Sequence, residues 1–146
     1  ALAQYAAEDS TYRSFAAETF LRAGATFIQR RDYARAVELL SRGRPWATAE
    51  MAPFYANYLG RAELQLITSE LLRVSDQRDC QGARRADTVL TRVRENLVAG
   101  MSVDSQRTAM MVESVLPGYV DNARRMAEAY CRQQQPQQRP PARRRP

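Results

Sequence analysis

The residues of this sequence that could do chemistry are few, and none of them forms a known catalytic set. The chain contains no histidine and no lysine among its 146 residues, so all 22 basic side chains are arginines. Histidine is the commonest general base and metal ligand, and without it a serine nucleophile lacks its usual activating base. Neither a G-x-S-x-G sequence nor a glycine-rich phosphate loop is present. We therefore expect a protein that is not an enzyme and that uses no metal or cofactor.

The two cysteines, Cys80 and Cys131, lie 51 positions apart, which fits neither a CxxC motif nor the spacing of zinc ligands. Two interpretations stay open, a disulfide in an exported protein or two buried free thiols in a cytoplasmic one. The first residues, Ala1–Ala3, read ALA and fit the A-x-A pattern that ends a secretory signal peptide. We therefore expect an exported protein, in the bacterial periplasm or envelope, in which the cysteines are paired.

The positive charge is concentrated at the C-terminal end of the chain. The formal net charge is +6, yet residues 1–131 hold 17 arginines and 16 acids. The remaining segment, RQQQPQQRPPARRRP, contains five arginines, four prolines and no acid. We predict one folded domain over residues 1–132 and a disordered or extended tail over 133–146. The tail is predicted to contact an acidic protein or an anionic membrane surface through Arg139, Arg143, Arg144 and Arg145.

Apolar residues recur at helical spacing through most of the first 132 residues, which predicts an all-α fold of about six helices. Asp9 and Ser10 precede the first apolar stripe and are predicted to begin the first helix there. Pro117-Gly118 interrupts the last stripe, and we expect the last helix to be kinked at that point. The chain has no apolar run of about 18 residues, so no transmembrane segment is expected. The predicted breaks fall at 30–32, 43–51, 75–80 and 100–102. Asp79 is the predicted cap of the fourth helix, Gly100 closes that helix, and Ser102 is the predicted cap of the fifth.

The segment FLRAGATFIQRRDYARAVELL, residues 20–40, resembles a tetratricopeptide repeat. Phe20, Gly24 and Phe27 stand at the aromatic and small positions of its first helix, and Ala36 and Leu40 follow at the spacing of its second. The resemblance covers residues 17–50 and is degenerate beyond them. It implies antiparallel helical hairpins stacked in a right-handed array, with Gly24 and Ala36 facing each other. The alternative is an irregular helical bundle, which is also all-α.

Repeat arrays of this kind hold other proteins on their concave face, which the first helix of each hairpin lines. The resemblance therefore implies a scaffold that binds protein. Together with the missing catalytic residues and the ALA sequence at Ala1–Ala3, it leads us to expect a non-enzymatic, exported scaffold, such as an accessory subunit of an envelope or membrane-associated complex. The alternative is a nucleic-acid or anionic-surface binder that acts through the tail, although the nearly neutral folded part argues against nucleic acid. A third interpretation is a small-molecule sensor. The candidate partner contacts are Tyr12, Arg13, Arg22, Tyr55, Asn57 and Arg61.

The predicted helices also indicate where the two cysteines lie relative to each other. Cys80 lies at the start of the fourth predicted helix and Cys131 at the end of the last one. If these two helices are antiparallel neighbours, their ends meet on one side of the fold. The sulfur atoms would then lie at the same level, within reach of a disulfide.

Overall fold

The computed structural model describes residues 2–133, with the side chains of residues 9–132, and every regular element in this part of the chain is helical. The predicted all-α fold is confirmed. The tail residues 134–146, with Arg139, Arg143, Arg144 and Arg145, lie outside the described residues. The elements are α1 (Leu2–Gln29), α2 (Tyr33–Gly43), the 3-10 turn η1 (Arg44–Trp46), α3 (Ala52–Gln77), α4 (Cys80–Ala99), α5 (Ser105–Met110), the π-helical turn η2 (Met111–Val115) and α6 (Leu116–Gln133).

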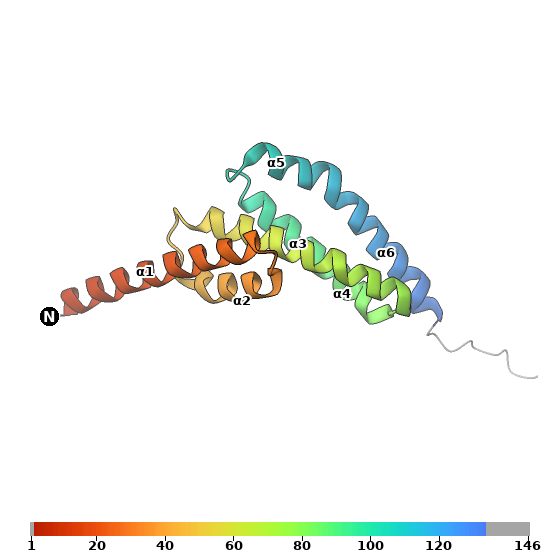
Figure 1. The fold of residues 1–146 in the computed structure, drawn as a ribbon, viewed down its shortest axis with the longest axis horizontal. Coiled ribbons are helices and arrows are strands. Elements are labelled where there is room, and N and C mark those ends of the chain that lie inside the picture. The colour runs from red at the N-terminus through yellow and green to blue at the C-terminus, as the bar shows by residue number, and fades with distance from the viewer. Residues whose placement is uncertain (1, 134–146) are drawn as a thin grey trace, which may run out of the picture.

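Each helix packs mainly on the next helix along the chain (Figure 1). α1 packs on α2, α2 on α3, α3 on α4, and α4 on α6, whereas the contacts of α1 with α3 and of α3 with α6 are smaller. Within residues 2–133, no extensive contact joins α1 to α6. The described residues therefore form an elongated, open stack of antiparallel helices, in which the two ends of the stack do not meet.

Side-chain caps begin two of the helices, with Asp32 before α2 and Asp79 before α4. Asp79, the predicted cap of α4, accepts a hydrogen bond from Gly82 N at 3.0 Å, which holds the pKa of the Asp79 carboxyl below its usual value. The prediction that the first helix begins at Ser10 is wrong, because α1 begins at Leu2 and passes through Ser10. The alanine-rich sequence before Ser10 favours helix strongly enough to outweigh these polar residues.

Pro117 lies in a helix that continues without a break from α5 through η2 to α6. Because proline has no N–H, it cannot donate the hydrogen bond that an α-helix needs at that position. The backbone widens into the π-helical turn η2 one turn before the proline. The irregularity that we predicted at Pro117-Gly118 is therefore centred on residues 111–115, upstream of the proline.

The buried side chains form two clusters, and α3 contributes to both. The smaller cluster joins α1, α2 and the first half of α3 through Ala17, Leu40, Tyr55 and Leu59. The larger cluster joins the second half of α3 to α4 and α6. Its buried members are Leu64, Ile67, Leu71, Ala86, Leu90, Val93, Leu97, Leu116 and Ala123.

The first hairpin packs closely around a glycine. A Cβ atom added at Gly24 would lie 2.5 Å from Cγ and Cδ2 of the fully buried Leu40. The side chain closest to Gly24 is therefore Leu40, one turn beyond the predicted Ala36, which is also fully buried. The second hairpin repeats this contact, because a Cβ atom added at Gly60 on α3 would lie 2.9 Å from Leu97 on α4.

The two phenylalanines of the repeat-like segment cover the sides of this hairpin. The Phe20 ring meets the Trp46 ring edge to face, with the centroids 6.2 Å apart. The guanidinium of Arg35 lies over the Phe27 ring, 5.6 Å from its centroid. These contacts are compatible with the tetratricopeptide resemblance, which itself stays a prediction.

A leucine at position 24 should destabilise the protein, because it would push α1 and α2 apart. We expect Gly24→Leu to lower the free energy of unfolding by about 1–3 kcal/mol, the usual cost of overpacking. The matched control is Gly118→Leu, because nothing lies within 4 Å of a Cβ atom at that position. This control should raise the stability by up to about 1 kcal/mol, since glycine is a poor helix former. Urea denaturation of both variants measures the difference, and equal effects would contradict the close packing at Gly24.

Cys80 and Cys131 join the start of α4 to the end of α6. Their sulfur atoms are at bonding distance, 2.06 Å, and their Cα atoms are 4.9 Å apart. α4 and α6 are packed against each other, so the predicted meeting of the two helix ends is confirmed. The pair closes a covalent loop that contains α4, α5, η2 and α6.

Loss of this bond should lower stability through the entropy of the unfolded chain. For a separation of 51 residues, the chain-entropy model gives a contribution of about 4 kcal/mol as an upper figure. We expect the Cys80→Ser/Cys131→Ser variant to unfold at lower denaturant concentration than the oxidised protein. Mass spectrometry of the native protein, unfolded and alkylated without reductant, should find no free thiol. Two alkylated cysteines would contradict both the bond and the export inferred from it.

Candidate functional site

The N-terminal half of α1 extends beyond the helices that cover the rest of it (Figure 1). α1 has 28 residues and α2 only 11, which correspond to lengths of about 42 Å and about 17 Å. Residues 9–13 of α1 are exposed. Two aromatic side chains lie in or next to this stretch, Tyr12 with 76% and Phe15 with 68% of its surface exposed. Because they are three residues apart, they lie on one face of the helix.

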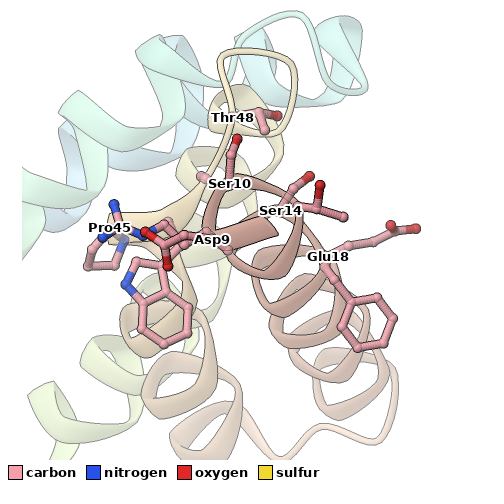
Figure 2. A pocket seen from close by; sticks show the side chains of 11 residues that line it. Asp9, Ser10, Ser14, Glu18, Pro45 and Thr48 are labelled. Carbon is pink, nitrogen blue, oxygen red and sulfur yellow. The ribbon is translucent and has the colours of Figure 1, made fainter. Parts of the chain in front are cut away.

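A cleft of about 810 Å³ lies between this part of α1 and the segment around η1. Figure 2 shows Asp9, Ser14 and Glu18 on successive turns of α1, with Pro45 and Thr48 on the opposite segment. Phe15 and Trp46 supply its aromatic lining, and Trp46 is 46% exposed. We call this feature the α1 cleft. Its shape and mixed lining suit a protein segment with both apolar and polar side chains.

The two predicted arginine contacts on α1 are exposed, but each is paired within the helix. Arg13 Nε lies 3.3 Å from Asp9 Oδ2, and Arg22 Nη2 lies 2.6 Å from Glu18 Oε1. Exposed pairs one helical turn apart are worth only about 0.3–0.5 kcal/mol. The charges on this surface are therefore balanced, and the aromatic side chains are its distinguishing feature.

Tyr55 is not available to a partner, because it is fully buried. Its hydroxyl donates a hydrogen bond to the carbonyl oxygen of Ala17 on α1. Burial raises the pKa of the Tyr55 phenol above its ordinary value, so the side chain stays a neutral donor. The residue that we predicted as a contact on the concave face instead joins α3 to α1.

Asn57 is also fully buried and holds the loop between α4 and α5 against α3. Its Nδ2 lies 3.1 Å from the carbonyl oxygens of Gly100 and Val103 and 3.0 Å from Oγ1 of Thr108. Arg61, one turn further along α3, pairs with Asp104 of the same loop at 3.3 Å. Of the six predicted contacts within the described residues, only Tyr12, Arg13 and Arg22 are therefore freely exposed.

A second surface, which the sequence did not reveal, lies between α2 and α4 with α3 as its floor. It consists of two adjoining hollows of about 520 and 360 Å³ that share Val37, Glu63 and Arg92 as lining residues. We call it the α2–α4 groove. It exists because α2 and α4 both pack on α3 and leave a space between them.

An ion pair crosses the middle of the α2–α4 groove. Arg92 Nε on α4 donates to Glu63 Oε2 on α3 at 3.0 Å, and this hydrogen bond raises the pKa of the Arg92 guanidinium. The Glu63 carboxylate is buried, and this pairing offsets the cost of its burial. No signal in the sequence could have paired these residues, because they are 29 positions apart. Within residues 2–133, no group of three or more cysteine, aspartate or glutamate side chains could hold a metal ion.

Removing the Asn57 amide should loosen the loop between α4 and α5. We expect Asn57→Ala to lower the free energy of unfolding by roughly 2–4 kcal/mol, since several buried hydrogen bonds are lost at about 1 kcal/mol each and a cavity remains. Asn122→Ala on the exposed surface of α6 is the control and should change stability little. Thermal and urea unfolding measure both variants. An Asn57→Ala protein as stable as the control would show that Asn57 does not have this structural role.

Within residues 2–133, none of the helices combines the length and apolar character needed to cross a membrane. Comparisons with protein-family models, with curated proteins and with solved structures find no match to this chain.

Proposed function

We propose that this protein is a non-enzymatic, exported helical scaffold that binds another protein, as an accessory subunit of an envelope or membrane-associated complex. The single observation that carries this proposal is the set of exposed aromatic side chains on and beside α1: Phe15 and Trp46 line the α1 cleft, and Tyr12 lies three residues before Phe15 on the same helix. Tyrosine, tryptophan and phenylalanine are enriched in protein interfaces, where their rings anchor the partner. The bond between Cys80 and Cys131 supports an oxidising compartment.

The partner segment that fits this surface best is an amphipathic helix. α2 covers only the second half of α1, so a second helix has room along the first half. Tyr12 and Phe15 present one apolar face, which matches a partner helix with apolar residues three and four positions apart. The internal pairing of Arg13 and Arg22 leaves no strong charge preference on this face.

The alternative, binding of nucleic acid or anionic surfaces, depends on arginines outside the described residues. Salt dependence distinguishes the two functions. Tail arginines that neutralise phosphates would give a steep fall of affinity with salt, whereas a packed aromatic interface would not.

A Tyr12→Ser/Phe15→Ser double variant should lose its partner without losing its fold, because both side chains are exposed. We expect affinity capture from a detergent-solubilised envelope fraction of the native organism, read by mass spectrometry, to recover a chain with the wild type. The double variant should not recover it. The control is Leu72→Ser on α3, where a 72%-exposed apolar side chain lies far from α1 in the chain; this variant should capture the same chain as the wild type.

The results of this capture experiment, together with a measurement of the oligomeric state, distinguish the candidate partners. A chain that both the double variant and the wild type capture would refute the α1 surface as the binding site. A concentration-dependent dimer of the pure wild type that the double variant cannot form would identify a second copy of this chain as the occupant. Sedimentation velocity of both proteins provides that measurement.

A further inference from the structure

One end of the α2–α4 groove has unused hydrogen-bond donors and positive charge. Asn96 on α4 lines this end and is only 4% exposed, yet its Nδ2 has no hydrogen-bond partner among the described residues. Arg44, also in the lining, is exposed and forms no ion pair within residues 9–132. Since Arg92 and Glu63 neutralise each other, Arg44 gives this end a net positive charge. The exposed guanidinium of Arg44 is the donor at this end that a ligand can reach, and it favours a carboxylate acceptor.

The opposite end of the groove is apolar. Leu66, Ile67 and Val89 line it, and Leu66 is 38% exposed. The carboxylate at this end, Glu70, already binds Arg73. A negative group in a ligand therefore belongs at the Arg44 end, and a large apolar group belongs over Leu66.

The spacing of the two ends gives the length of the ligand. Val89 and Asn96 are seven residues apart on α4, and thus about 10 Å apart along the helix axis. An extended peptide advances about 3.3 Å per residue, so three to four residues span this distance. A carboxylate and an apolar side chain separated by that number of residues would reach both ends of the groove together.

We propose that the α2–α4 groove binds an extended segment of a partner protein that carries an aspartate or glutamate three to four residues from a large apolar side chain. The carboxylate lies at Arg44, at the end of the groove that Asn96 lines, and the apolar side chain lies over Leu66 and Val89. The chain's own tail does not have this chemistry, because residues 132–146 contain five arginines and no acid. This site does not depend on the proposed surface around Tyr12 and Phe15.

Selection of random linear peptides displayed on phage, with the full-length oxidised protein as target, tests this proposal. We expect the enriched peptides to share an acidic residue three to four positions from leucine, isoleucine, valine, phenylalanine or methionine. One enriched peptide is then synthesised with a fluorescent label, and its affinity is measured by anisotropy. Raising the salt concentration should weaken its binding, because the Arg44 charge is exposed.

Matched variants locate the bound peptide. Arg44→Gln should weaken binding about three- to tenfold, as expected for loss of a charge-assisted hydrogen bond. Arg42→Gln, an exposed arginine on α2 outside the groove and paired with Glu38, should leave the affinity unchanged. Leu66→Ser should weaken binding, whereas Leu72→Ser should not. The Tyr12→Ser/Phe15→Ser variant should bind the peptide as the wild type does, so this result is independent of the proposed function.

Three results would overturn the proposal. The first is no enrichment of peptides, or enrichment of peptides without an acidic residue. The second is equal affinity of the selected peptide for the wild type, Arg44→Gln and Leu66→Ser. The third is full displacement of the peptide by inorganic phosphate together with tight binding of phosphate alone, which would make the groove a site for small anions.

Discussion

The burial of α3 on two sides is the constraint on which the rest of this structure depends. Within the described residues, α3 is the only helix that contributes to both buried clusters, through Tyr55 and Leu59 in one and Leu64, Ile67 and Leu71 in the other. Neither the first hairpin nor the pair of α4 and α6 has an extensive contact with the other. The two parts are therefore positioned by a single helix, and polar side chains fix it in place. Tyr55 bonds to α1, and Asn57 bonds to the loop that follows α4.

The same open packing leaves grooves on the molecule. Because each helix packs mainly on its neighbours in the chain, helices two places apart have no extensive contact and do not close over the helix between them. α2 and α4 flank α3 in this way, and their groove retains a buried amide donor and an ion pair. A closed bundle would cover such groups with a further helix. The stack of described helices instead leaves these surfaces uncovered, which is the physical basis of the proposed binding function.

Sequence reasoning worked best where local chemistry decides the outcome. Asp79 as the cap of α4, Gly100 at its end and the break at residues 30–32 follow from caps, glycine and interrupted apolar spacing, and all are found in the structure. The placement of Cys80 beside Cys131 followed from the expected antiparallel helices. The start of α1 failed because capping residues also occur inside long helices. Ser102 likewise fails as the predicted cap of the fifth helix, which begins at Ser105 after Asp104.

The functional residues were harder to predict, because burial of a polar side chain depends on distant parts of the chain. Tyr55 and Asn57 have the chemistry of interface residues, but Asn57 is buried by a loop whose residues are 43 to 51 positions away. Asn96 and Glu63 show no periodic or motif signal, and their importance comes from the space between α2 and α4. Tyr12 and Phe15 are exposed because α2 is short and ends at Gly43.

The bond between Cys80 and Cys131 also determines how the protein would respond to mechanical load. If a partner held α1 while the C-terminal tail was anchored elsewhere, tension would pass along the backbone to Cys80 and then directly to Cys131. The intervening loop with α4, α5 and most of α6 would carry no backbone tension, and the residues between the two cysteines could not add to the extension of the chain. The contacts of α1, α2 and α3 would yield first. The N-terminal hairpin would act as the extensible part of the molecule and the disulfide-closed part as its rigid end.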